Sequence, residues 1–253
     1  MEIFDCHCEF GRREIPPPRR AEDAAALVGL LTQMGAARAL VVHSAMIGLD
    51  VPTGNARVVD ESRDFPQLLP TWALLPPQTN ELGDCAAFFA AMRVAGVRAL
   101  WAFPHTARFA LDGRTLGAWL DGMTQRAIPL LLNIGGGKTG VEYAELATLL
   151  AEAPAALPVI GVLHAAWGED RYFRPLLESF PNLRLALSGY LPADGITALV
   201  DRYGAERFLY ASSFPDHQPG GSLLMLLHAG LRDDDLAAVA GGNLSRLLSE
   251  VTW

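Results

Sequence analysis

Eight short apolar runs recur along the whole chain, and this repetition is the feature that most constrains its fold. They cover Glu2–Cys8, Ala37–His43, Leu68–Leu75, Val97–Phe103, Ile128–Asn133, Val159–His164, Leu183–Ser188 and Arg207–Ser212. Their starts are spaced by roughly 25–35 residues, the length of one βα unit. Because the runs are nearly all apolar and do not alternate, they predict parallel strands that are covered on both faces.

Amphipathic stretches lie between most of these runs and predict helices. Apolar residues recur there at positions i, i+3 and i+4, as in Ala24–Met34, Cys85–Ala95, Tyr143–Ala151 and Ile196–Tyr203. The segment Gly48–Pro66 is polar and irregular where a helix is due, so we expect a loop. Leu223–Leu227, Asp233–Ala240 and Asn243–Val251 predict closing helices, which Gly241-Gly242 punctuates.

Eight strands with intervening helices favour a closed (β/α)8 TIM barrel over an open, doubly wound sheet. A barrel of this kind commonly contains ~250 residues in one unit. No linker or internal boundary is visible in the sequence, so we expect residues 1–253 to form a single barrel domain.

Charge and cysteine content narrow the range of partners and compartments. The chain has 28 acidic and 20 basic side chains and a net charge of -8, which disfavours binding to nucleic acid or to an anionic membrane. We therefore expect a small-molecule partner. The three cysteines cannot form a disulfide framework, and neither a signal peptide nor a membrane-spanning run is visible. We expect a cytoplasmic protein, and a homodimer as the commonest assembly.

Histidines are enriched where the predicted strands end. His7, His43 and His164 fall at carboxyl ends of strands, and His105 and His217 fall in the loops that follow strands four and eight. Catalytic side chains of barrel enzymes come from these positions. An imidazole there can bind a metal ion or act as a general base, and a polar cap over the barrel is the alternative interpretation.

The first strand presents two sets of polar side chains. By the alternation of a strand, Asp5, His7 and Glu9 share one face and Cys6 and Cys8 share the other. This geometry argues against a joint cysteine and histidine site. We expect both thiols to lie toward the helices as small buried side chains.

Five segments, in chain order, carry a resemblance to one family. They are Ile3–Gly11, Pro158–Gly168, Phe180–Gly189, Arg207–Pro215 and Gly241–Leu248. In turn they resemble the first-strand Asp-x-His-x-His motif, the sixth-strand histidine motif, the Pro-Asn segment, the Gly-Ser-Asp-x-Pro box and the closing Gly-Asn-x-x-Arg-Leu-Leu of the amidohydrolase-related (amidohydrolase 2) family. The resemblance covers essentially the whole chain and implies a metal-dependent-hydrolase-like barrel.

The resemblance also implies an activity, although the usual active-site set is incomplete. Family members generally use a divalent metal ion to activate water, which implies a hydrolase or decarboxylase of a small cyclic or carboxylated compound with bound Zn or Mn. Here Glu9 replaces the second histidine, Asn133 the fifth-strand histidine and Ser213 the eighth-strand aspartate. His7, Glu9 and His164 are the candidate metal ligands. His164, Ser213 and Asp216 are the candidate catalytic residues, since Asp216 can replace the lost carboxylate.

These substitutions leave two other interpretations open. The protein can be a metal-free family member in which His7 or His164 acts as general base, with no cofactor. It can also be a non-catalytic barrel that serves as a binding or structural subunit.

Several residues are candidates for binding substrate. The segment Gly135–Gly140 contains Lys138, the only lysine of the chain, but Leu132 replaces the glycine that a nucleotide-binding loop requires. A carboxylate or phosphate group can instead be bound there by Lys138 and backbone N–H groups. Asn133, Lys138, Trp167 and Phe214 are therefore the predicted substrate-binding residues. Arg12-Arg13 and Arg19-Arg20 either recognise an anionic substrate or are solvated.

Overall fold

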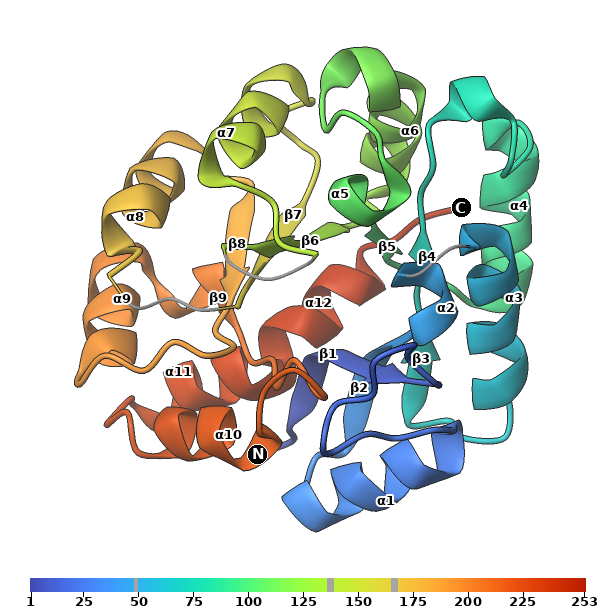
Figure 1. Cartoon of the computed structure of the whole chain (residues 1–253). Coiled ribbons are helices and arrows are strands. Elements are labelled where there is room, and N and C mark those ends of the chain that lie inside the picture. Colours follow the sequence, from blue (N-terminus) through green and yellow to red (C-terminus); the bar gives the residue numbers. More distant parts are fainter. Residues whose placement is uncertain (48–49, 136–138, 165–167) are drawn as a thin grey trace.

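The computed structural model describes residues 1–47, 50–135, 139–164 and 168–253, and its strands form a ring of parallel pairs (Figure 1). The strands are β1 (Phe4–Phe10), β2 (Arg38–His43), β3 (Leu68–Pro70), β4 (Trp72–Ala73), β5 (Leu100–Trp101), β6 (Leu130–Ile134), β7 (Val159–Leu163), β8 (Leu183–Ala186) and β9 (Phe208–Leu209). Pairing runs in the order β1-β2-β3 in one sheet and β4-β5-β6-β7-β8-β9 in the other. Each pair is parallel, as the continuous apolar runs predict.

Strands β3 and β4 are two halves of one barrel strand that is interrupted at Thr71. The first half pairs with β2, where Leu68 lies opposite Ala39, and the second half pairs with β5, where Trp72 lies opposite Leu100. The Thr71 side chain donates a 2.7 Å hydrogen bond to the carbonyl of Val41. The two sheets are therefore continuous through Thr71, and the nine strands correspond to the eight predicted runs.

The ring closes between β1 and the segment that follows β9. The Cys6 N–H donates to the Tyr210 carbonyl at 3.0 Å, and the Glu9 N–H donates to the Phe214 carbonyl at 2.9 Å. Cys8 and Phe214 form a parallel bridge at the same seam. These bonds leave the (β/α)8 barrel without a free edge, and the predicted fold class is confirmed.

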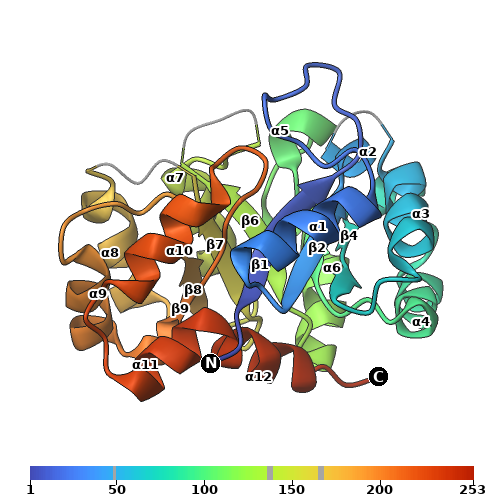
Figure 2. The ribbon, with the colours of Figure 1, turned by 90° about the horizontal axis from the view of Figure 1, so that it is seen from below.

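Helices connect and cover the strands on the outside of the ring (Figures 1 and 2). They are α1 (Ala24–Met34), α2 (Ser44–Ile47), α3 (Val51–Ser62), α4 (Cys85–Ala95), α5 (Pro104–Ala107), α6 (Gly113–Arg126), α7 (Tyr143–Glu152), α8 (Asp170–Ser179), α9 (Gly195–Tyr203), α10 (Pro219–Leu227), α11 (Asp233–Ala237) and α12 (Asn243–Ser249). The four predicted covering helices correspond to α1, α4, α7 and α9. The three predicted closing helices correspond to α10, α11 and α12.

The loop expected over Gly48–Pro66 is wrong for its described part, because α3 occupies Val51–Ser62. The helix begins after Asp50, whose side chain accepts a 3.0 Å hydrogen bond from the Thr53 N–H. Its buried face includes the polar Asn55, which bonds both backbone groups of Ala73 in β4. The buried face of α3 therefore carries a polar residue that satisfies the backbone of Ala73, at a position where the other helices carry an apolar residue.

The last helices lie across the amino-terminal end of the barrel (Figure 2). A π-helical turn, η3 (Ala238–Gly242), joins α11 to α12. The predicted interruption of the closing helices at Gly241-Gly242 is therefore wrong, because the backbone stays helical there. A Cβ atom on Gly241 would lie 2.8 Å from the Glu2 carbonyl oxygen. Glycine is therefore required there for close approach to the start of β1. No helix in the described ranges combines the length and apolar character needed to span a bilayer.

Strand β1 is irregular at the polar residues that the sequence singles out. Its pairing register with β2 shifts between Asp5 and Cys8. The buried Asp5 carboxylate accepts hydrogen bonds from the N–H groups of His7 at 3.1 Å and Ser212 at 2.9 Å, and from the Cys8 thiol at 3.2 Å. The predicted alternation is thus wrong at Asp5, which contacts Cys8 and ties β1 to the segment after β9.

A candidate active site at the carboxyl end of the strands

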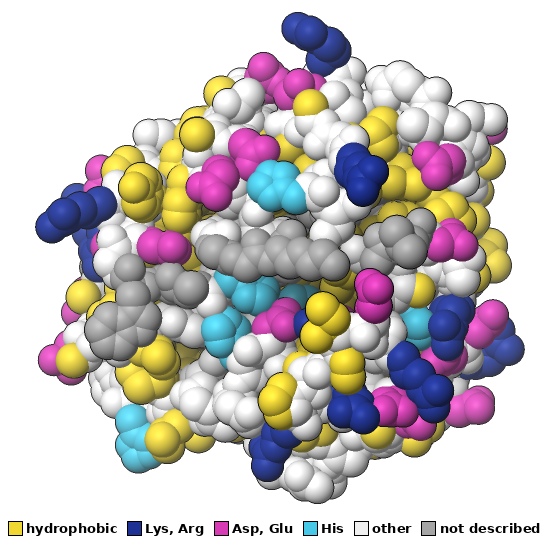
Figure 3. Space-filling model, viewed as in Figure 1, with side chains coloured by type: hydrophobic (Ala, Val, Ile, Leu, Met, Phe, Trp, Pro, Cys, Tyr) yellow, Lys and Arg dark blue, Asp and Glu magenta, His cyan; other side chains and the backbone are white. Residues whose placement is uncertain are grey.

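Polar side chains from four parts of the barrel meet at the carboxyl ends of the strands. His7 and Glu9 lie on β1, and Asn133 lies on β6. His164 directly follows β7, and the segment Ser213–His217 follows β9. Figure 3 shows histidine side chains near the middle of this face, beside acidic and basic side chains. The topology therefore gathers residues that lie far apart in the sequence, as the barrel rule predicts.

Three histidines form the centre of this site. The ring centroids of His7 and His164 are 6.4 Å apart, and those of His164 and His217 are 5.3 Å apart. The Nε2 atoms of all three rings are buried and have no hydrogen-bond partner among the described residues. Buried polar atoms normally find a partner. Three such atoms in one cluster therefore mark a place where a ligand or water can bind.

Burial keeps two of these imidazoles neutral. It lowers the pKa of His7 to about 3, with further lowering from His164 and Arg13 and opposition from Asp216. Burial also lowers the pKa of His164 to about 4, against the same opposing charge of Asp216. A neutral imidazole has one nitrogen free to accept a proton or a hydrogen bond, so both rings are available as bases over the physiological range.

Ser213 orients the first of these rings. Its hydroxyl oxygen lies 3.3 Å from Nδ1 of His7, and both side chains are buried. The Ser213 backbone has a φ of 51°, a left-handed conformation that a residue with a side chain rarely adopts. Such strain often occurs at functional sites. The contact leaves Nε2 of His7 as the nitrogen that faces the cluster.

Arg13 binds two carboxylates at the edge of the histidine cluster. Its Nε donates to Oε1 of Glu9 at 2.6 Å, and its Nη2 donates to the other Glu9 oxygen. The same guanidinium donates to both oxygens of Asp216, at 2.5 Å from Nη1 and 3.1 Å from Nη2. The expectation that Arg13 is solvated is therefore wrong, because an internal ion pair occupies four of its N–H donors, and its recognition of an anionic substrate stays a prediction.

The ion pair has opposite effects on its two carboxylates. Burial raises the pKa of Glu9, and the hydrogen bonds and charge of Arg13 only partly oppose that rise. Burial also acts to raise the pKa of Asp216, but its bonds to Arg13 and the nearby His164 and His7 lower it overall. Asp216 is thus the firmly ionised member, and it brings negative charge close to the histidines.

Aromatic and amide side chains surround the histidines. The His7 ring packs 4.5 Å from Trp101, which stacks on Phe103 at 5.5 Å. Asn133 donates from Nδ2 to the Thr139 hydroxyl at 2.8 Å, and its Oδ1 has no partner within the described ranges. The site therefore combines an apolar wall with one free amide oxygen, a combination that is typical of small-molecule pockets.

Some predicted site residues lie elsewhere. Phe214 is buried, helps to close the barrel through its backbone, and borders a separate hollow with Pro18 and Arg19. Lys138 and Trp167 lie outside the described residues, so their predicted roles stay predictions. The sequence offers His217 and Arg13 only as general candidates on loops, because the contacts of His217 with His164 and of Arg13 with Asp216 form only in the fold.

The arrangement of donors does not support a bound metal ion. No group of three or more His, Cys, Asp or Glu side chains is placed to hold a metal ion within residues 1–47, 50–135, 139–164 and 168–253. Among the predicted ligands, Glu9 directs both oxygens to Arg13 rather than toward the rings of His7 and His164. The predicted ligand set stays a prediction, and the residues present do not fit a divalent ion as they are arranged.

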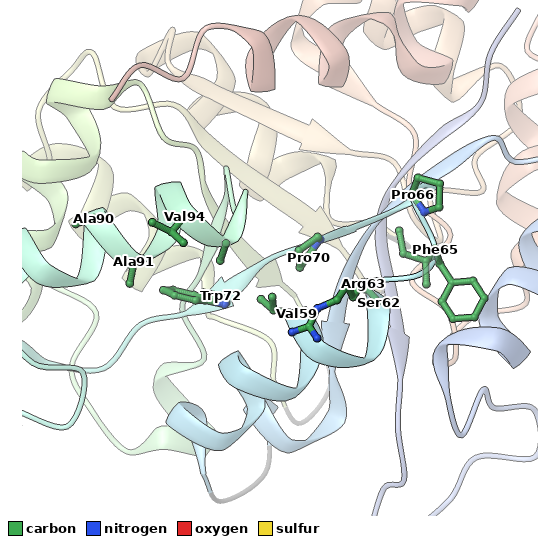
Figure 4. Close-up of a pocket in the computed structure, with 12 residues that line it drawn as sticks. Val59, Ser62, Arg63, Phe65, Pro66, Pro70, Trp72, Ala90, Ala91 and Val94 are labelled. Atoms are coloured by element: carbon green, nitrogen blue, oxygen red, sulfur yellow. The ribbon is translucent and has the colours of Figure 1, made fainter.

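A groove of about 820 Å³ lies away from these residues, between α3 and α4 (Figure 4). Its lining is mostly apolar and includes Phe65, Trp72 and Val94, with Arg63 as its charged member. The lining contains no histidine or carboxylate from the described part of the chain. This groove therefore presents no candidate general acid or base among the described residues.

Comparisons with known proteins agree with the barrel at low sequence identity. No protein-family model matches the chain, and no curated protein matches it. A putative 2-pyrone-4,6-dicarboxylic acid hydrolase from Pseudomonas putida matches with a TM-score of 0.73 and 18% identity, over 100% of this chain and 99% of that chain. A dihydroxybenzoic acid decarboxylase from Polaromonas sp. JS666, with bound manganese and the inhibitor 2-nitroresorcinol, matches with a TM-score of 0.76 and 13% identity, over 98% and 97%.

A putative amidohydrolase from Staphylococcus aureus is also similar, with a TM-score of 0.71 and 13% identity over 98% of this chain and 100% of that chain. These identities are too low to transfer an activity or a ligand set. The resemblance drawn from the sequence motifs is confirmed at the level of the fold. The chain shares its (β/α)8 architecture with these three proteins.

Proposed function

We propose that this protein is a hydrolase of a small cyclic or carboxylated compound, and that it acts through its neutral histidines. The observation that carries the proposal is the cluster of His7, His164 and His217, whose buried Nε2 atoms have no partner among the described residues. Of the similar barrels, one is described as a dicarboxylic acid hydrolase and another as a dihydroxybenzoic acid decarboxylase. Those descriptions support the substrate class.

His164 is the proposed general base. Its Nε2 is free, and its lowered pKa, about 4, keeps it unprotonated at neutral pH. It takes a proton from a water molecule as that water attacks the carbonyl carbon of a lactone, ester or amide. The C–O or C–N bond to the leaving group then breaks, and the protonated His164 gives its proton to the leaving oxygen or nitrogen and becomes neutral again. Positioned bases of this kind accelerate a reaction typically ~10²–10⁴-fold.

The other side chains of the cluster orient and enclose the substrate in this proposal. His7 is fixed through its contact with Ser213 and directs Nε2 into the cluster. The free Oδ1 of Asn133 accepts a hydrogen bond from a substrate hydroxyl or amide. Trp101 covers one side of His7 and excludes water from it.

Decarboxylation is the second candidate, because several similar barrels are described as decarboxylases. The loss of CO₂ leaves a carbanion that must receive a proton. His7 and His164 carry no extra proton at neutral pH, since burial lowers both pKa values. The site as arranged therefore favours hydrolysis over decarboxylation.

A panel of small substrates tests the proposal directly. Lactones, esters, amides and carboxylated phenols are incubated with the protein, and products are measured by liquid chromatography and mass spectrometry. We expect hydrolysis of a lactone or ester, a loss of about 10²-fold or more in His164→Ala, and no change in His228→Ala, where the histidine is exposed. Unchanged turnover in His164→Ala overturns the assignment. Tight binding without turnover of any compound favours a non-catalytic barrel instead.

A further inference from the structure

The geometry around Arg13 carries an inference about cations. The chain leaves β1 through Gly11, whose φ of 104° turns it back over the strand end. A Cβ atom there would lie 2.5 Å from Oγ of Ser44 and 2.7 Å from Nε2 of His43, so the turn requires glycine. This turn brings Arg13 back over Glu9, four residues earlier in the chain.

The two carboxylates that Arg13 binds come from opposite sides of the barrel seam. Glu9 lies on β1, and Asp216 lies in the segment after β9. Arg13 donates four hydrogen bonds to them, two to each carboxylate. Pairing of both oxygens of a carboxylate with a guanidinium is the most favourable geometry for such an ion pair. The acidic side chains of this edge therefore direct their oxygens at an internal cation.

The burial of these groups makes the arrangement costly to change. The Glu9 side chain is 2% exposed, and that of Arg13 is 26% exposed. A buried carboxylate that loses its partner keeps its desolvation penalty but loses the electrostatic attraction that offset this penalty. A divalent ion that binds here must either displace Arg13 from both carboxylates or approach its positive charge, and both are unfavourable.

We propose that the Arg13 guanidinium is the resident cation of this site, which it keeps free of divalent metal ions by occupying Glu9 and Asp216. Neutral replacement of Arg13 exposes both carboxylates beside the histidine cluster and creates a metal site. Carboxylate oxygens and imidazole nitrogens together bind Zn and Mn. The proposal concerns cation binding and holds whether or not the protein catalyses the proposed hydrolysis.

Equilibrium dialysis against Mn²⁺ and against Zn²⁺, followed by elemental analysis of metal per chain, tests this proposal without any substrate. We expect wild-type protein to retain well below one equivalent and Arg13→Gln to retain about one. Arg13→Lys preserves the positive charge and is expected to remain like wild type. Arg12→Gln is the matched surface control, because Arg12 is 84% exposed and pairs with Glu22.

Circular dichroism establishes that each variant is folded before dialysis. If Arg13→Gln does not fold, Arg13→Leu supplies the same readout with a neutral side chain that cannot bind a metal ion. One equivalent of metal in wild type that is lost in His164→Ala overturns the proposal, because the site then binds metal with Arg13 in place. The proposal is also overturned if a folded Arg13→Gln or Arg13→Leu variant retains no more metal than wild type.

Discussion

The low pKa of His164 predicts a specific loss of stability in acid. In the folded protein burial holds this pKa at about 4, whereas in the unfolded chain it returns to the ordinary value of 6.5. Between these two values the unfolded state binds more protons than the folded state. The contribution of His164 to stability is therefore fully present above pH ~6.5 and is lost progressively as the pH falls toward ~4.

The size of the effect follows from the two pKa values. At about pH 5 the unfolded histidine is almost fully protonated and the folded one almost fully neutral. The effect therefore accumulates over the roughly 1.5 pH units between the unfolded pKa and pH ~5. At about 1.4 kcal/mol per unit, His164 removes about 2 kcal/mol from the free energy of unfolding between pH ~7.5 and pH ~5. His164→Gln cannot titrate, so its stability must fall by about 2 kcal/mol less than that of wild type over the same interval.

Urea unfolding, followed by tryptophan fluorescence at the two pH values, measures this difference. Comparing each variant with itself at two pH values removes the direct effect of the substitution on stability. His228→Gln is the matched control, because His228 is exposed. If the losses in free energy of unfolding between the two pH values agree within about 0.5 kcal/mol for wild type and His164→Gln, the claim that His164 is buried as a neutral ring is refuted.

Two further predictions concern the frame that positions the site. Gly54→Ala in α3 places a Cβ atom 2.4 Å from the backbone nitrogen of Met46 and should destabilise the protein by more than about 1 kcal/mol. Gly117→Ala in α6 places a Cβ atom with no neighbour within 4 Å and should stabilise the protein by about 0.5–1 kcal/mol. Thermal unfolding compares the pair, and equal changes in Tm would contradict the steric argument. Asn55→Leu removes both hydrogen bonds to the backbone of Ala73 and should cost about 2–4 kcal/mol in urea unfolding, because two buried groups lose their partner. A cost below about 0.5 kcal/mol would show that β4 finds other partners.

The barrel was predictable because its strands have a distinctive sequence. Strands covered on both faces form continuous apolar runs, and the regular return of such runs indicates repeated βα units. Helix α3 was missed for the opposite reason. Its first turn contains Pro52 and Gly54, which resemble a loop, and its buried face carries Asn55 and Ser62. The partner of Asn55, Ala73 in β4, is visible only in the fold, and Ser62 donates to the Val58 carbonyl within the helix itself.

The site was predictable only where a residue belongs to a strand end. His7 and His164 stand at such ends, so the barrel rule alone placed them. Arg13 and Asp216 meet across 203 positions of sequence, and no local pattern predicts that contact. Because His217 follows Asp216 on the same loop, it also reaches the cluster through the fold rather than through any spacing in the sequence.

Two of the positions at which the chain departs from the motifs it resembles, Glu9 and Ser213, are contacted by other residues of the site. A glutamate introduced alone at position 9, with 2% of its side chain exposed, would be a buried charge without a partner and would destabilise the protein by about 3–5 kcal/mol. Arg13 supplies that partner, and Asp216 binds the rest of the guanidinium. Ser213, which stands where the resemblance implies aspartate, contacts His7 with a neutral hydroxyl. Glu9 and Ser213 are therefore each matched by a contact within the site, which supports the proposal of a rearranged functional centre over the alternative of a decayed one.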